Sequence, residues 1–220
     1  RLRVVLGDLR HETIGRHSAY LPVGIGYLAS YATARYGAEA LEFSLHSSVP
    51  EIIQVIENDN PDVIGLTNYC WNAELSREVM TYAKSLNRNV VCIGGGPEFP
   101  EATDEVSEYM NYRQETDFFV IQEGEVSFAL LIEKILNGLS LPSLKSEPCP
   151  GAYSMHPENH TLVFAPPPPR LTDLDVIPSP YLSGMFDKFL DGTYMPFLES
   201  QRGCPYACTF CHEGAQWRNK

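Results

Sequence analysis

The chain has 220 residues, which is enough for one domain of ordinary size and part of a second. Its composition, 44% hydrophobic and 20% charged residues, is that of an ordinary globular protein, and no run of eighteen apolar residues predicts a membrane span. The formal net charge is −12, which argues against a nucleic-acid-binding surface because such surfaces are basic.

Apolar runs alternate with segments of helical periodicity through residues 1–140. Five short apolar runs predict buried strands, which we expect at residues 2–6, 39–44, 62–67, 89–93 and 117–121. The segments after them predict helices at residues 23–36, 50–59, 72–86, 100–112 and 126–137. Such alternation is typical of a parallel sheet with helices on both faces. Because parallel crossovers are right-handed, we expect an α/β domain with a flavodoxin-like, doubly wound sheet of five parallel strands in the order 2-1-3-4-5.

The carboxyl ends of the predicted strands carry polar residues and glycines. In a doubly wound sheet, ligands bind outside these ends, at the point where the strand order reverses. The four ends of interest read Gly7-Asp8, Thr67-Asn68-Tyr69, Gly94-Gly95-Gly96 and Gln122-Glu123-Gly124-Glu125. The sequence contains neither a dinucleotide-binding glycine pattern after the first strand nor a phosphate-binding loop. A nucleotide site of either kind is therefore not predicted.

Prolines become frequent after residue 140. A run of four, at residues 166–169, predicts a stiff extended connector. We also expect a small hairpin, a strap that lies on a neighbouring domain, a short helix and a strand, at residues 151–164, 171–178, 183–190 and 194–199. The sequence therefore predicts an α/β domain, a linker and the start of a second domain, at residues 1–140, 141–192 and 193–220.

Three cysteines lie close together in residues 202–211, the cysteine segment. Their spacing is Cys204-x3-Cys208-x2-Cys211. Three thiolates on one loop suit an iron–sulfur cluster, because soft sulfur ligands favour iron, and a four-iron cluster would keep one iron free for another ligand. Zinc is the alternative. It would need a fourth ligand, and the adjacent His212 directly follows Cys211, which is awkward for a tetrahedral site.

Two other cysteines, Cys70 and Cys92, stand at the ends of predicted core strands. We expect both to be buried free thiols, and the cysteine pattern as a whole fits a reducing cytoplasm. The chain begins at Arg1 without a basic-then-apolar leader, and we expect its start to be truncated.

The cysteine segment, with the aromatic residue Phe210 just before the third cysteine, resembles the signature of the radical S-adenosylmethionine (radical SAM) superfamily. The resemblance implies a 4Fe-4S cluster on Cys204, Cys208 and Cys211, whose open iron binds S-adenosylmethionine. One electron, from a reductant such as flavodoxin or ferredoxin, would cleave that cofactor to a 5′-deoxyadenosyl radical. Phe210 would pack near the adenosyl group, and Arg202 would support the loop. A radical SAM barrel needs far more chain than follows the cysteines, so we expect only its opening.

Several segments of the α/β domain resemble the cobalamin-binding domain that precedes many radical SAM barrels. They are Leu21–Ala29, Val63–Thr67, Gly94–Pro97 and Glu123–Glu125, and Leu174–Tyr181 resembles the connector in those enzymes. The resemblance implies contacts between cobalamin and the carboxyl edge of the sheet, at Thr67, Asn68, Tyr69, Gly94, Gly95 and Gly96. Glycines let the backbone approach a flat corrin ring closely. The alternative is that the three glycines only form a tight turn.

The loop after the first strand departs from the cobalamin domains of the methyl-carrier type. Those use Asp-x-His-x-x-Gly, with the histidine on cobalt, whereas this loop reads Asp8-Leu9-Arg10-His11 and reaches its glycine only at Gly15. His11 is one candidate cobalt ligand, and we favour a cobalt face without a histidine. We expect His17 and His46 to be loop or surface residues.

Two further pairs of residues stand at strand ends. Glu123 and Glu125 are expected to cap the helix that follows, because carboxylates suit the positive end of a helix. Tyr69 and Trp71 could pack against the corrin edge or within the protein, and we favour packing against the corrin.

These resemblances imply a cobalamin-dependent radical SAM enzyme that methylates an unactivated carbon of a small-molecule substrate. Oxidative cyclisation and rearrangement are alternative reactions for an enzyme of this kind. A non-catalytic corrinoid-binding module, and a radical SAM enzyme whose first domain has lost cobalamin, are two further alternatives. We expect no nucleic-acid or membrane partner.

Overall fold

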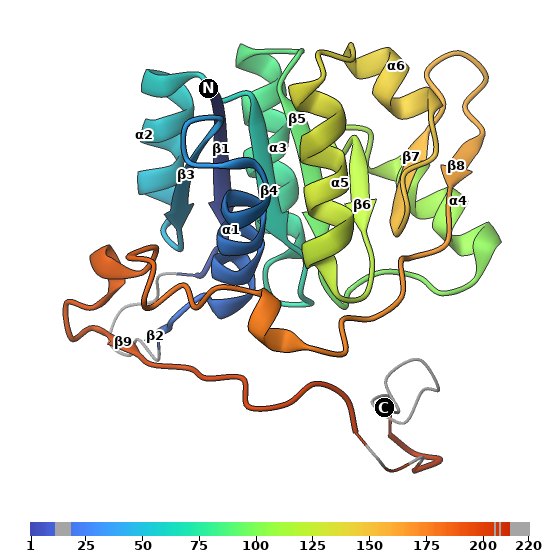
Figure 1. Ribbon diagram of the computed structural model, residues 1–220. Helices are drawn as coiled ribbons and strands as arrows, with labels where there is room; N and C mark the ends of the chain where they lie inside the picture. The colour runs from blue at the N-terminus through green and yellow to red at the C-terminus, as the bar shows by residue number, and fades with distance from the viewer. Residues whose placement is uncertain (12–18, 205, 207, 212–220) are drawn as a thin grey trace.

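A computed structural model describes residues 1–11, 19–204, 206 and 208–211 of the chain. One large sheet stands at its centre, with helices packed on both faces (Figure 1). The strands are β1 Leu2–Gly7, β2 Ala19–Tyr20, β3 Leu41–His46, β4 Val63–Thr67, β5 Val91–Gly95, β6 Phe118–Val120, β7 Ala152–Met155, β8 Leu162–Phe164 and β9 Tyr194–Met195. The helices are α1 Val23–Tyr36, α2 Val49–Asp59, α3 Ala73–Leu86, α4 Thr103–Tyr112, α5 Gly124–Leu136 and α6 Leu141–Ser146. None of the helices in the described residues is long and apolar enough to cross a membrane.

The strand order in the large sheet is β3-β1-β4-β5-β6-β7-β8. The first five of these strands are parallel, and their order is the predicted 2-1-3-4-5 when the short β2, which belongs to another sheet, is set aside. The doubly wound α/β class is therefore confirmed. The sheet is wider than the predicted five strands, because the hairpin expected in the linker adds β7 and β8 in antiparallel pairing beyond β6.

Apolar side chains fill both faces of the sheet. Val4 and Leu6 of β1 belong to the core under α1 and α5, whereas Val5 belongs to the core under α2 and α3. A strand covered on both faces must be apolar at consecutive positions. This requirement explains why the parallel strands were recognisable as continuous apolar runs.

Residues 170–201, the edge segment, run along the carboxyl edge of the sheet, where Figure 1 shows them as the orange and red trace below the strands. Phe186 anchors this segment, because its ring is fully buried against Gly26 of α1. An added Cβ at Gly26 would lie 2.2 Å from Phe186 Cζ. The Tyr181 hydroxyl donates to the Phe197 carbonyl at 2.7 Å and so closes a loop within the segment. The strap forecast for part of this region thus lies on the α/β domain of the same chain.

Two elements expected in the edge segment are shorter than predicted. The helix expected at 183–190 is a single 3-10 turn, Asp187–Phe189, because Gly184 has a φ of 78°, which no right-handed helix contains. The strand expected at 194–199 is the two-residue β9, parallel to β2. It stops at Pro196 because proline lacks the N–H that a strand ladder needs.

Two side chains lie in environments that differ from the expectation. His46 is buried, with Nδ1 3.2 Å from Lys188 Nζ, so the expected surface position is wrong, because the edge segment covers the end of β3. Cys70 is exposed rather than buried, because β4 ends three residues earlier, at Thr67. Cys92 is buried as expected. His17 lies outside the described residues.

The contact between Gly26 and Phe186 predicts that one added methyl group at position 26 will lower the stability of the fold. We expect Gly26→Ala to lower the free energy of unfolding by about 1–3 kcal/mol, because the new Cβ overpacks the contact with the ring. Gly24→Ala is the matched control on the same helix, since nothing lies within 4 Å of its added Cβ. Urea unfolding followed by circular dichroism measures both. Phe186→Leu should reduce the cost of Gly26→Ala, and equal stability of the two alanine variants would contradict the prediction.

Candidate cofactor cavity

A cavity of about 910 Å³ opens at the carboxyl ends of β4, β5 and β6, between the sheet and the N-terminal turns of α1 and α5. Its floor is apolar, and Leu6, Leu66, Ile93, Val120 and Phe128 contribute to it. The edge segment and the first residues of the cysteine segment form its outer wall. The volume lies at the upper end of the range for ligand cavities, so the cavity suits a large ligand with an apolar part.

All three predicted glycines, Gly94, Gly95 and Gly96, line this cavity. An added Cβ at Gly94 would lie 2.9 Å from the Phe119 ring, and one at Gly96, whose φ is 142°, would lie 2.5 Å from the Asn68 carbonyl oxygen. At Gly95 the closest atom would be 3.4 Å away. The strand end therefore needs glycine at two of these positions for its own packing, and the same absence of side chains leaves the cavity open.

Gly24, in the first turn of α1, also lines the cavity, and an added Cβ there meets nothing within 4 Å. The sequence stretch Val23-Gly24-Ile25-Gly26-Tyr27 thus has two glycines with different roles. Gly26 admits Phe186 from the edge segment, and Gly24 leaves space in the cavity. Gly24 was missed as a candidate contact, although the glycine pair in one helical turn was a usable signal, because glycine is unfavourable in helices.

Thr67 lines the cavity, but its hydroxyl is already engaged. It donates to Asp8 Oδ1 at 2.8 Å and accepts from Asn72 Nδ2 at 2.9 Å. Burial raises the pKa of the Asp8 carboxyl above its ordinary value, and the Thr67 hydrogen bond and the charge of Arg10 partly offset that effect. The switch point of the sheet therefore holds a partly buried acid, which does not line the cavity but is hydrogen-bonded to Thr67, which does.

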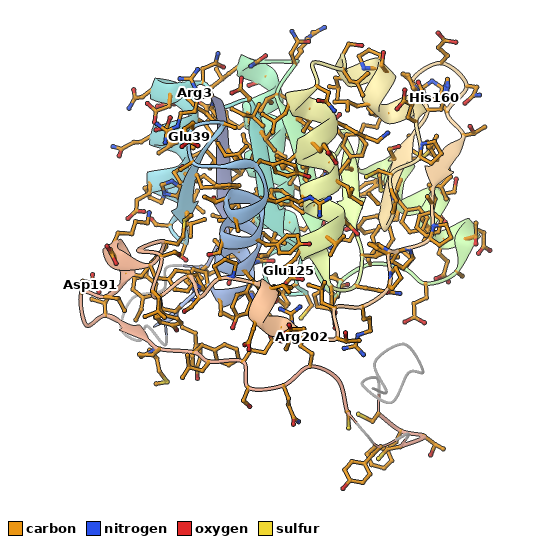
Figure 2. All side chains as sticks on the ribbon, in the orientation of Figure 1. Arg3, Glu39, Glu125, His160, Asp191 and Arg202 are labelled. Atoms are coloured by element: carbon orange, nitrogen blue, oxygen red, sulfur yellow. The ribbon has the colours of Figure 1, made fainter. Side chains whose placement is uncertain are left out.

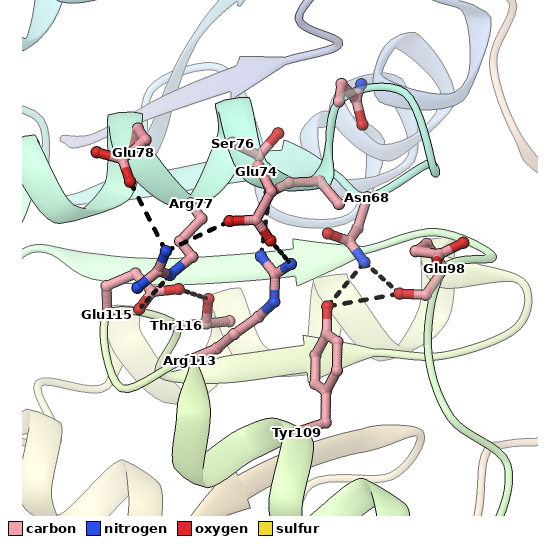
Figure 3. Close-up of polar contacts among 12 residues, drawn as sticks. Asn68, Glu74, Ser76, Arg77, Glu78, Glu98, Tyr109, Arg113, Glu115 and Thr116 are labelled. Carbon is pink, nitrogen blue, oxygen red and sulfur yellow. Dashed lines mark hydrogen bonds and ion pairs between the residues drawn. The ribbon is translucent and has the colours of Figure 1, made fainter.

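Asn68 points to the opposite side of the strand end. Its amide donates to the Glu98 carbonyl and, at 2.9 Å, to the Tyr109 hydroxyl, as Figure 3 shows. Asn68 is buried, and it is absent from the residues that line the cavity. Its amide thus fixes the turn that carries the three glycines, and a ligand in the cavity would not meet it without rearrangement.

Tyr69 lines the cavity and stacks on Trp71, with ring centroids 4.5 Å apart. Trp71 is half exposed, and its carbonyl oxygen lies 2.7 Å from Nε2 of His11. His11 is exposed and stands outside the cavity, and no histidine is among the described residues that line it.

Charged side chains gather at the mouth of the cavity. Arg170 Nε donates to Glu123 Oε1 at 2.8 Å, and Arg202 donates to both carboxylate oxygens of Glu125, at 2.6 and 3.1 Å. Figure 2 labels Glu125 and Arg202 side by side below the sheet. Glu123 makes no side-chain capping bond to α5, so the expected capping role is wrong for Glu123. Local sequence could not reveal these arginines, which come 47 and 77 residues later.

The three cysteines stand beyond this mouth. Cys204 is half-buried, whereas Cys208 and Cys211 are exposed, and the Cys211 N–H donates to the Cys208 carbonyl at 3.1 Å. Phe210 is exposed as well. Within the described residues, no three histidine, cysteine or acidic side chains are gathered as a metal site. His212, the alternative zinc ligand, lies outside the described residues.

Comparison with known proteins assigns this chain to a family. Residues 16–132, more than half of the chain, match the model of the B12 binding domain. The chain is 28% identical over 207 residues to an uncharacterized methyltransferase, PH0819, of Pyrococcus horikoshii, and this match covers 90% of the chain and 42% of the relative. It is 30% identical over 208 residues to the cobalamin-dependent radical SAM methyltransferase TokK of Streptomyces tokunonensis, with 89% of the chain and 29% of TokK covered.

Among solved structures, the cobalamin-dependent S-adenosylmethionine radical enzyme OxsB, with aqua-cobalamin and S-adenosylmethionine bound, is similar in fold. The TM-score is 0.68 at 21% identity, and the match covers 96% of this chain and 28% of that one. The chain thus spans less than half the length of the proteins it resembles. With its glycine-lined cavity at the carboxyl edge of a doubly wound sheet, the chain belongs to the B12-binding domain family.

Proposed function

We propose that this chain is the cobalamin-binding part of a radical SAM methyltransferase, and that the same chain supplies the cysteines of the 4Fe-4S cluster. One observation carries the proposal. The same cavity is lined by Gly95 at the end of β5 and by Arg202 and Gly203, and Gly203 is followed directly by Cys204. A ligand in the cavity would therefore lie next to the start of the cysteine segment.

The residues of the cavity fit cobalamin. A corrin with its nucleotide tail has a flat ring, an apolar body and several amide arms. The apolar floor between the sheet and α5 suits the tail, and Gly24 and Gly95 leave room for the ring. Glu123 Oε2 is buried without a hydrogen-bond partner, and such an oxygen is costly unless a donor reaches it. An amide arm of a corrin carries that donor.

The cysteine segment fits the cluster through its donor set. Three thiolates within eight residues are the ligands that iron–sulfur clusters use, and the turn from Cys208 to Cys211 keeps two of them close together. We propose Cys204, Cys208 and Cys211 as the cluster ligands and Phe210 as a contact of the adenosyl group.

The carboxyl of Asp8, at the switch point of the sheet, also supports a ligand site. Asp8 is held by Thr67 and Asn72 in a position where burial disfavours its charged form. Perturbed acids of this kind concentrate at functional sites. We propose that Asp8 orients Thr67 and so shapes the cavity wall.

When bound, the two cofactors would supply a methyl group and a carbon-centred radical, which is chemistry that side chains cannot perform. The protein's own part is to hold the corrin against the sheet edge and to keep the cysteine segment beside it. The partners that we propose are a small-molecule substrate and a reductant such as flavodoxin or ferredoxin.

Filling the cavity from Gly24 tests the cobalamin half of this proposal. We expect Gly24→Leu to weaken binding of hydroxocobalamin at least ten-fold, because the new side chain occupies space that the ligand needs. The stability of the ligand-free protein should hold, since no atom lies near the added Cβ and leucine favours helices. Titration followed by the corrin absorption spectrum measures the affinity, and Gly24→Ala should lose less. Equal affinity of Gly24→Leu and wild type would contradict the proposal.

Removing one thiolate tests the cluster half. After anaerobic reconstitution with iron and sulfide, the whole protein with Cys208→Ala should bind less than a third of the wild-type iron, because two cysteines do not retain a cluster of this kind. Cys70→Ala is the control, since Cys70 is an exposed cysteine that does not belong to the cysteine segment. Wild-type iron content and a wild-type visible spectrum in Cys208→Ala would contradict the assignment.

Asp8 predicts a pH dependence of stability. Its pKa in the folded protein is raised above the unfolded value, so the folded state binds the proton more tightly. The stabilisation from that proton is complete below the unfolded pKa of about 4, and it is lost as the pH rises through the folded pKa. We expect Asp8→Asn to be more stable than wild type at pH 7, by an amount that shrinks toward pH 4.

Denaturant unfolding between pH 4 and pH 8 measures this dependence. Asp104→Asn, in the exposed first turn of α4, is the control and should leave the pH profile unchanged. If Asp8→Asn is less stable than wild type by the same amount at every pH, the pKa of Asp8 is not raised by folding and the prediction is wrong.

A further inference from the structure

Arg202 opens the cysteine segment, and its side chain is enclosed by the α/β domain, with 10% of it exposed. The two terminal nitrogens of the guanidinium donate to the two oxygens of Glu125, at 2.6 and 3.1 Å. The remaining Nε donates to Glu199 Oε2 at 3.0 Å. All three nitrogens of the guanidinium therefore donate hydrogen bonds. A bidentate pair of this kind fixes orientation as well as distance.

The partner of this fork is itself immobile. Glu125 lies in the first turn of α5, and its side chain is 7% exposed, so its charge needs a partner to offset the cost of burial. The Arg202 guanidinium also lies over the ring of Tyr27 on α1, 5.5 Å from its centroid. Arg202 is thus held from both helices that flank the cavity.

Little else holds the chain near the cysteines. Before Arg202, the Glu199 backbone is hydrogen-bonded to Tyr27 of α1, and Phe197 is bound through its backbone to Tyr181 of the edge segment. Beyond Arg202, the described part of the cysteine segment makes no hydrogen bond or ion pair to the α/β domain, and Gly203 has a left-handed φ of 83°. Arg202 therefore makes the last polar attachment that the described residues show before Cys204.

This attachment limits where the first cysteine can go. Two residues span at most about 7 Å, so an immobile Arg202 keeps Cys204 at the mouth of the cavity that Arg202 and Gly203 themselves line. A lysine could keep the charge. It could not reproduce two parallel donors in one plane, because its ammonium is a single point.

We propose that Arg202 is a positioning residue, whose bidentate pair with Glu125 sets the separation between the cavity and the cysteines. The proposal rests on the proposed function, in which the cavity holds cobalamin and the cysteines hold the cluster. In this proposal the two cofactor sites are aligned by the planar, two-donor geometry of the guanidinium and not by its charge. Arg202 then acts on the reaction only through the cysteine segment.

The first test needs no cofactor. Trypsin cleaves after arginine and lysine, and in the whole wild-type protein the buried Arg202 should protect the bond to Gly203. We expect Glu125→Gln and Arg202→Lys each to accelerate cleavage at this bond at least ten-fold, as measured by mass spectrometry of timed digests. Cleavage after the exposed Arg88 is the internal standard for folding, because it should be equally fast in all variants. Glu98→Gln is the matched control, because Glu98 is an exposed glutamate that does not line the cavity.

The second test reads the separation of the two sites. In whole protein that carries both a reduced cluster and cob(II)alamin, magnetic coupling between the two centres is visible by electron paramagnetic resonance and depends on their distance. We expect Arg202→Lys to change that coupling in the molecules that carry both cofactors. A merely stabilising role for Arg202 would instead lower cofactor content and leave the coupling of the loaded fraction unchanged.

The outcomes separate the inference from the function on which it rests. If wild type binds neither cobalamin nor iron, the proposed function fails, and the trypsin rates still decide whether Glu125 holds Arg202. If the cofactors bind but Arg202→Lys keeps both wild-type protection and wild-type coupling, the positioning role is overturned. Faster cleavage together with altered coupling supports it.

Discussion

The packing of Phe186 against Gly26 is the contact on which the arrangement of the site depends. A sheet with open carboxyl ends offers a ligand only a shallow edge, and the cavity becomes deep because the edge segment forms its outer wall. That segment has almost no regular structure, so its own hydrogen bonds cannot hold it in place. One aromatic ring, buried where a helix lacks a side chain, supplies the main apolar attachment, and ion pairs such as Arg170–Glu123 add to it. Glycine at position 26 lowers the helix propensity of α1, but it lets the edge segment pack on α1 and form a wall of the cavity.

The charges at the cavity mouth follow from this arrangement. The chain carries a net charge of −12, yet two arginines meet the carboxylates of the first turn of α5. Glu125 alone, buried beside the cavity, would be strongly destabilising, and the same is true of Arg202 alone. Each makes the other tolerable, and their pairing couples the position of the edge segment to the helix that bounds the cavity. The buried pair of Arg202 and Glu125 thus lies where it fixes the position of the segment that leads to the cysteines.

The fold was largely predictable because its determinants are local. Strands covered on both faces are apolar throughout, helices show one apolar face, and the alternation of the two leaves few topologies. The errors arose where a residue's partner is distant in sequence. Glu123 satisfied the local rule for a helix cap, but its side chain pairs instead with Arg170, which lies 47 residues away. His46 looked like a surface residue because nothing near it in sequence announces Lys188, which covers it from 142 residues away.

The candidate site was predictable in type and less so in detail, for a reason that Thr67 and Asn68 illustrate. Thr67 ends β4, and Asn68 follows it in the turn, so the two adjacent side chains lie in different surroundings. Thr67 faces the cavity and spends its hydroxyl on Asp8, whereas Asn68 faces away and holds the turn. The polar groups beside the cavity therefore serve mainly to fix the backbone. Recognition of a large, mostly neutral ring then falls to shape, which glycines provide, and to Glu123 Oε2, the buried oxygen at the mouth that has no hydrogen-bond partner among the described residues.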